Sequence, residues 1–205
     1  LDGSITVLAE SYQGKKLNAP NDVIVRSDGT IWFTDPTYGI MGDYEGYKAE
    51  PEQPTRNVYR LDPKSGELTA VITDFVQPNG LAFSPDETKL FVADSAYSHD
   101  EKAPRHIRAF DVVDDGKRVT GGRVFCTIDN GLPDGFRFDT EGNLWTSAGD
   151  GVHCFSPEGK LLGKIKTPQT VANVTFGGPR RNRLFITATK SLYAVYLTVT
   201  GAQYP

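Results

Sequence analysis

A short polar motif occurs four times in this chain of 205 residues, and each copy is followed by an apolar strand, a tight turn and a second strand. Three copies begin with proline, and all four carry Asn or Asp at the second position. The copies are Pro20-Asn21-Asp22-Val23, Pro78-Asn79-Gly80-Leu81, Pro133-Asp134-Gly135-Phe136 and Ala172-Asn173-Val174. A unit that repeats in this way is typical of a repeat architecture, in which each copy is one supersecondary element.

Each repeat has the composition of a small antiparallel sheet. The strand that follows the motif is predicted at 23–25, 81–83, 136–138 and 174–176. The later strands are predicted at 30–35, 57–62 and 68–75; at 89–94, 106–112 and 123–128; at 143–147, 151–156 and 160–166; and at 183–188 and 191–197. Their β-branched and aromatic residues, the turn residues between them and the lack of a period near 3.6 residues predict an all-β fold. Four-stranded sheets repeated radially form a β-propeller.

The repeats divide the chain into propeller blades within a single domain, 1–205. We predict blades over 18–77, 78–132 and 133–170, and an incomplete last blade over 171–205. Within residues 1–17, the segment Ser4–Leu8 is expected to be the outermost strand of a preceding blade. Since propellers close with about four to eight blades, we expect an N-terminally incomplete propeller of about four blades.

Composition narrows the partners of the protein. The formal net charge of −4 argues against nucleic acid and anionic membranes as partners. No apolar run approaches the ~20 residues that span a bilayer. We favour a cytoplasmic location and leave open whether a signal peptide precedes Leu1. We make no prediction of the oligomeric state. Cys126 and Cys154 lie in apolar strands without metal or redox spacing, so both are expected to be reduced and buried.

The motif places polar side chains at one edge of each sheet. In an antiparallel pair, the start of the first strand lies beside the end of the second. The expected neighbours are Asn21 and Asp35, Asn79 and Asp94, and Asp134 and Ser147. Because the first strand of a blade is the innermost, Asn21, Asn79 and Asp134 are expected to converge on the propeller axis. Their amide and carboxylate oxygens suit calcium, magnesium or manganese.

A structural interpretation competes with this one. Asn and Asp are common at strand starts because their side chains bond nearby backbone groups, and for Asp35 and Asp94 this interpretation is favoured. The long connection 36–56 and the segment 95–105 are expected to overhang the site. The three histidines, His99, His106 and His153, have no spacing that indicates a catalytic pair and are expected to be surface or strand residues.

Four segments of the chain resemble a known family. They are LNAPNDVIVRSDGTIWFTDPTYGI (17–40), PNGLAFSPDETKLFVADS (78–95), PDGFRFDTEGNLWTSAGDGVHCFSPEGKLLGKI (133–165) and NVTFGGP (173–179). They are similar to the SMP-30/gluconolactonase/luciferin-regenerating-enzyme family over essentially the whole chain. The resemblance implies a six-bladed propeller, hydrolysis of sugar lactones and one divalent cation, with calcium favoured and zinc, magnesium or manganese as alternatives.

The resemblance also implies roles for particular residues. Asn79 and Asp134 fall on metal-ligand positions, and Asp134 matches the acid that acts as general base. Asn21 falls on a position that contacts metal or substrate, and Asn18 and Tyr38 are expected to bind substrate. The family's glutamate ligand, from a blade before the first motif, has no counterpart here.

We therefore expect a metal-dependent lactonase, a carboxylic-ester hydrolase acting on a small-molecule lactone. Two alternatives stay open. One is a propeller that binds a ligand or protein on its top face without catalysis. The other is an esterase or organophosphate hydrolase on the same scaffold.

Overall fold

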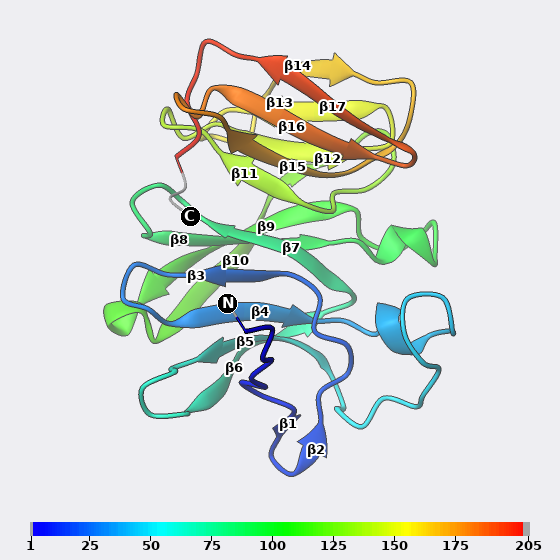
Figure 1. Ribbon diagram of the computed structural model, residues 1–205, viewed down its shortest axis with the longest axis vertical. Helices are drawn as coiled ribbons and strands as arrows, with labels where there is room; N and C mark the ends of the chain where they lie inside the picture. Colours follow the sequence, from blue (N-terminus) through cyan, green and yellow to red (C-terminus); the bar gives the residue numbers. More distant parts are fainter. Residues whose placement is uncertain (1, 203–205) are drawn as a thin grey trace. The chain divides into compact units, whose positions relative to one another are not determined.

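The computed structural model describes residues 2–202, which form an all-β chain of four propeller blades (Figure 1), as the sequence predicted. The first blade contains β3 (Val23–Val25), β4 (Ile31–Asp35), β5 (Arg56–Leu61) and β6 (Leu68–Phe75). The second contains β7 (Pro78–Phe83), β8 (Lys89–Asp94), β9 (His106–Val113) and β10 (Arg118–Thr127). The third contains β11 (Phe136–Phe138), β12 (Leu144–Ala148), β13 (Gly151–Phe155) and β14 (Leu161–Lys166), and the fourth β15 (Val171–Gly177), β16 (Arg183–Ala188) and β17 (Ser191–Tyr196).

Every sheet is an antiparallel meander in which strands that are consecutive in sequence pair. Among the described residues, three short 3-10 helices lie in the connections between strands: η1 (Tyr38–Ile40), η2 (Ala96–Ser98) and η3 (Asp114–Gly116). The chain divides into two compact units at Phe75 and Val76. The first unit holds the first blade, and the second unit holds the other three.

The first unit also contains a hairpin that the sequence did not predict. Its strands are β1 (Ser11–Tyr12) and β2 (Lys15–Lys16), joined by Gln13 and Gly14, which both have positive φ. Two such residues give the twist that suits a tight hairpin. The Gln53 side-chain amide donates to three carbonyl oxygens of the hairpin, at 2.9–3.1 Å, and thereby ties the end of the 36–56 connection to it.

The strand expected over Ser4–Leu8 does not form. Residues 2–9 have no regular structure, and Ile5, Val7 and Leu8 are largely exposed. A run of apolar β-formers becomes a strand only when another strand pairs with its backbone. Among the described residues no strand pairs with this segment, and its place as the outer strand of a preceding blade stays a prediction.

The core of the second unit joins its three sheets. One apolar cluster combines side chains from β7 to β13, and Phe91 of β8 meets Phe138 of β11 edge to face at 4.8 Å between ring centroids. A second cluster joins β13 to β15 and β16 through Val152, Val174 and Leu184. Aromatic contacts of this geometry add to the stabilisation from burial. The three blades of this unit are therefore packed against one another by continuous apolar contacts.

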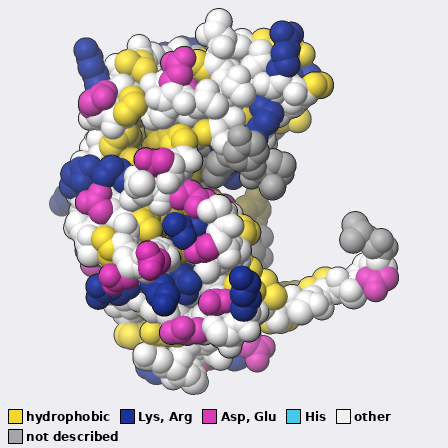
Figure 2. Space-filling view, turned by 90° about the vertical axis from the view of Figure 1, so that its left-hand side faces the viewer, with side chains coloured by type: hydrophobic (Ala, Val, Ile, Leu, Met, Phe, Trp, Pro, Cys, Tyr) yellow, Lys and Arg dark blue, Asp and Glu magenta, His cyan; other side chains and the backbone are white. Residues whose placement is uncertain are grey.

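Both cysteines are reduced and buried, as predicted. Burial raises the pKa of Cys126 and of Cys154 to about 12, so neither thiol is a nucleophile near neutral pH. No helix among residues 2–202 has the length and apolar character needed to cross a membrane. On the face drawn in Figure 2, basic and acidic side chains are intermingled.

Candidate metal and active site

Buried carboxylates fix the backbone just before the first two motif copies. The Asp94 carboxylate, at the end of β8, accepts the N–H groups of Val76 and Gln77, each at 3.0 Å. In the first unit, the Asp35 carboxylate accepts those of Asn18 and Ala19, at 3.0 and 2.8 Å. Asp94 and Asp35 thus act as backbone caps, which agrees with the structural interpretation of these two residues.

The Asp35 carboxyl is expected to make the free energy of unfolding depend on pH. Burial raises its pKa to about 6, although its two backbone donors favour the anion. The folded chain therefore keeps this proton to a higher pH than the unfolded chain. We expect this group to lower the free energy of unfolding as pH rises from about 4 to about 6, by at most about 1.4 kcal/mol per pH unit, with no further change above.

Urea unfolding at a series of pH values measures this effect when the wild type is compared with Asp35→Asn, which cannot titrate. The variant is expected to be less stable by about 1–3 kcal/mol, because an amide leaves one backbone donor without an acceptor. The stability difference between the two proteins should shrink as pH rises through the window. A constant difference would contradict the role given to Asp35.

Backbone irregularities place the motif residues. In β7 the register changes from Pro78 opposite Asp94 to Leu81 opposite Val92, so Asn79 and Gly80 form a bulge. In β15 a similar irregularity separates Val171 from Asn173. A bulge turns a side chain away from the regular alternation of a strand. In the β7 copy the second position, Asn79, therefore lies within the bulge, whereas in the β15 copy the extra residue is Ala172 and Asn173 follows it, opposite Thr187.

The three motif copies of the second unit touch one another through their glycines. A Cβ added at Gly80 would lie 2.0 Å from the carbonyl oxygen of Asp134, and one added at Gly135 would lie 2.0 Å from Oδ1 of Asn173. Only glycine, which lacks a Cβ, permits such approaches. The segments that carry Asn79, Asp134 and Asn173 thus lie side by side, although they come from three different blades.

Hydrogen bonds hold the main chain of the central copy on both sides. The Asp134 N–H donates to Oγ of Ser147 at 2.8 Å, and the Ser147 N–H donates to the Gly135 carbonyl at 3.1 Å. On the other side, the Gly135 N–H donates to the Ala172 carbonyl at 2.9 Å. The expected proximity of Asp134 and Ser147 is therefore found.

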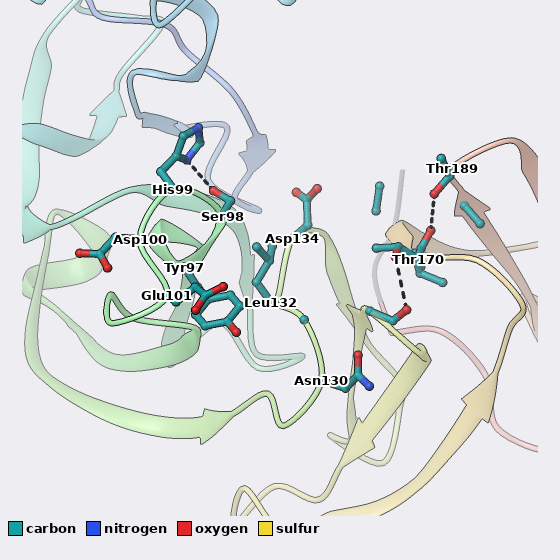
Figure 3. A pocket seen from close by; sticks show the side chains of 15 residues that line it. Tyr97, Ser98, His99, Asp100, Glu101, Asn130, Leu132, Asp134, Thr170 and Thr189 are labelled. Atoms are coloured by element: carbon teal, nitrogen blue, oxygen red, sulfur yellow. Dashed lines mark hydrogen bonds between the residues drawn. The ribbon is translucent and has the colours of Figure 1, made fainter.

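The Asp134 side chain points into a cavity of about 790 Å³ in the second unit (Figure 3). The cavity is lined by 97–101, 130–132, Asp134, Gly149, 170–172 and 188–189. In Figure 3, Asp134 lies between the 97–101 segment on one side and Thr170 and Thr189 on the other. This volume is typical of pockets for small molecules.

The 97–101 wall carries a histidine in a defined orientation. Oγ of Ser98 donates to the Ser95 carbonyl at 3.0 Å and lies 2.7 Å from Nδ1 of His99. Since the hydroxyl proton is directed to Ser95, Nδ1 of His99 is the donor of the second bond. In the neutral imidazole, Nε2 is then the basic nitrogen. His99 is one of the residues that line the cavity. His106 and His153 lie in strands, as expected.

The other predicted site residues belong to the first unit. The Asn21 N–H donates to the Thr34 carbonyl at 2.9 Å, at the entry to β3, and Tyr38 opens η1. Asn18 is buried, and its amide nitrogen donates to the carbonyls of Asp35 and Thr55, at 3.3 Å each. These contacts describe the position of each residue within the first unit only. The convergence of Asn21, Asn18 and Tyr38 with Asn79 and Asp134 stays a prediction.

A second polar group, which the sequence did not reveal, joins the third blade to the connection that enters it from β10. Asp129, Asp150 and His153 place one ligand atom each within 4.8 Å of one another, so the described residues include a group that could hold a metal ion. Two lysines of β14, Lys164 and Lys166, form ion pairs with its carboxylates. In the sequence, only the spacing Asp150-x-x-His153 and the two alternating lysines pointed to this group. The signal was weak, because the third member, Asp129, comes from another connection.

Comparisons with known proteins agree with the resemblance. The family described as SMP-30/Gluconolactonase/LRE-like region matches residues 1–190. A gluconolactonase of Zymomonas mobilis is 35% identical over 206 residues, covering 96% of this chain and 55% of the relative. The lactonohydrolase oryL of Aspergillus oryzae is 31% identical over 202 residues, covering 90% of this chain and 45% of the relative.

A solved structure shares the architecture. The structure of a Xanthomonas campestris gluconolactonase has a TM-score of 0.86 and 41% identity, covering 98% of this chain and 62% of that protein. The present chain therefore spans about half the length of the two curated relatives that it matches. Its four blades correspond to part of the six-bladed propeller of these homologues.

Proposed function

The chain belongs to the SMP-30/gluconolactonase/LRE-like family, and we propose that the protein is a metal-dependent hydrolase that opens sugar lactones. The proposal rests mainly on one observation. Asp134 points into a cavity of small-molecule size, and its backbone touches the segment that carries Asn79. The lactonase names of the relatives and their identity over nearly the whole of this chain support the reaction class.

The donor chemistry of this site fits a hard divalent cation. Asn79 offers an amide oxygen and Asp134 a carboxylate, and oxygen ligands of these types suit calcium. Manganese and magnesium accept the same donors. We propose Asn79 and Asp134 as metal ligands, with Asn21 as a third ligand or a contact to substrate. When bound, such a cation supplies Lewis-acid polarisation of a carbonyl group.

The chain itself supplies the proton transfer in this proposal. One oxygen of the Asp134 carboxylate can hold the cation while the other takes a proton from the attacking water. General-base catalysis of this kind contributes about 10²–10⁴ in rate. The bond from the Asp134 N–H to Ser147 and the bond from the Gly135 N–H to Ala172 fix the main chain that carries this carboxylate.

The walls of the cavity suit a polyol ring. Asn130, Thr170 and Thr189 present amide or hydroxyl groups, and the 97–101 segment adds Tyr97 and His99. Hydroxyl-rich substrates are bound by a few placed polar groups of this type. Asn18 and Tyr38 are proposed as further substrate contacts. These polar groups support an aldonolactone, such as glucono-1,5-lactone, as the proposed substrate class.

Calcium addition tests the proposal directly. At a calcium concentration about 100 times Kd, binding to the folded state stabilises it by about 2.7 kcal/mol, which raises Tm by roughly 5–10 °C in a chain of this size. Acid release from glucono-1,5-lactone, followed in a pH-stat, is expected to require the cation and to stop after chelation. Absence of both responses would favour a propeller that binds ligands without catalysis.

A further inference from the structure

A buried histidine in the third blade has one ring nitrogen without a hydrogen-bond partner among the described residues. His153, on β13, has a relative exposure of 0%. Its Nε2 lies 2.6 Å from Oδ1 of Asp150. Its Nδ1 is buried, has no hydrogen bond to any of residues 2–202, and lies 3.8 Å from Oδ1 of Asp129. A buried polar atom in this condition lowers stability and indicates an additional partner.

The surroundings decide which nitrogen carries the proton. Asp150 also accepts a bond from Lys166, so its carboxylate is an anionic acceptor, and Nε2–H of His153 is the donor of the 2.6 Å bond. In the neutral imidazole, Nδ1 then holds the lone pair. Oδ1 of the Asp129 carboxylate lies 3.8 Å from this nitrogen, so two acceptor atoms are close together. A cation between them would satisfy both.

We propose that Nδ1 of His153 and the Asp129 carboxylate bind a divalent transition metal of the zinc class, with Asp150 orienting the imidazole. A metal-bound histidine commonly donates its other N–H to a carboxylate, and Asp150 provides this contact. Imidazole with carboxylate suits zinc or similar ions, whereas calcium takes oxygen ligands. The site is therefore chemically distinct from the all-oxygen set at Asn79 and Asp134.

A lysine of the same blade competes for this position. Nζ of Lys164 lies 2.6 and 2.8 Å from the two carboxylate oxygens of Asp129, and 3.6 Å from Asp150. Metal bound at Asp129 must displace this ammonium group or share the carboxylate with it. Removing the lysine charge is accordingly expected to tighten metal binding, and removing the Asp129 charge to weaken it.

Nitrogen-15 NMR of the histidine rings, with zinc added to the full chain, tests the proposal without any variant. We expect His153 to show a protonated Nε2 and an unprotonated Nδ1 near neutral pH, and zinc to shift the Nδ1 resonance. An imidazolium with protons on both nitrogens, unchanged by zinc, would overturn the proposal, because a proton would then occupy the position given to the metal.

Three variants test the proposed ligands by zinc titration. Lys164→Gln is expected to bind zinc about threefold more tightly or better, and Asp129→Asn about tenfold more weakly or worse. Asp111→Asn is the matched control, since this exposed aspartate of the same unit also pairs with a lysine, and it should leave affinity unchanged. A zinc response that survives Asp129→Asn and disappears in Asp134→Asn would place the metal at the other site and overturn the proposal.

Discussion

Replacing Asp134 by Asn is expected to reduce kcat/KM for glucono-1,5-lactone by about 10³-fold or more. The proposed roles of this carboxylate combine proton removal from water, worth about 10²–10⁴, with binding of the cation. The amide keeps the size of the side chain but cannot take the proton. Steady-state kinetics and a calcium titration on the same variant should show the loss of turnover and the loss of metal affinity together.

The control for this experiment is Asp111→Asn, which removes the charge of a different aspartate. Asp111 lies on β9, does not line the cavity, and pairs with Lys89. Its substitution changes the net charge by the same amount and should leave lactone hydrolysis within about twofold of the wild type. Near-wild-type hydrolysis in Asp134→Asn would show that another residue activates the water, whatever the effect on calcium.

Replacing Gly80 by Ala is expected to lower the free energy of unfolding by about 3 kcal/mol or more, because the new methyl group would lie 2.0 Å from the backbone carbonyl of Asp134. A backbone atom cannot move aside as a flexible side chain can. The strain falls on the contact between two motif copies, so the variant should also bind calcium more weakly. Urea unfolding and calorimetric titration provide the two values.

Gly163→Ala is the matched control for the glycine experiment. Gly163 lies on β14, and an added Cβ would meet no atom within 4 Å. The same chemical change there should alter the free energy of unfolding by at most about 1 kcal/mol. Equal losses in the two variants would mean that the effect comes from glycine's conformational freedom and not from the close approach at Gly80.

The strands of the four blades could be predicted because they have strong local signals. Apolar runs such as Lys89–Asp94 and Arg183–Ala188 match the observed strands in full, and turn residues bound them. Ser4–Leu8 has a similar apolar composition but forms no strand, because pairing depends on a partner that composition does not reveal. The β1–β2 hairpin was not predicted, because its strands have only two residues each.

The candidate site could be predicted in part. The repeated motif identified Asn79 and Asp134, and the antiparallel geometry identified Ser147 as a neighbour of Asp134. The contact through Gly80 was not predicted, because it joins separate blades and depends on their packing. The group around His153 was missed for a similar reason: Asp150 is only three residues away, but Asp129 comes from the connection between β10 and β11 and is brought close by the fold.

The most direct test of the account is a crystal structure of the protein grown with manganese, in which anomalous scattering locates the ion. We expect a peak within coordination distance of the amide oxygen of Asn79 and the carboxylate of Asp134, beside the cavity that Asp134 enters. A manganese ion bound elsewhere, with these two side chains directed away from each other, would contradict the proposed metal centre and the mechanism built on it.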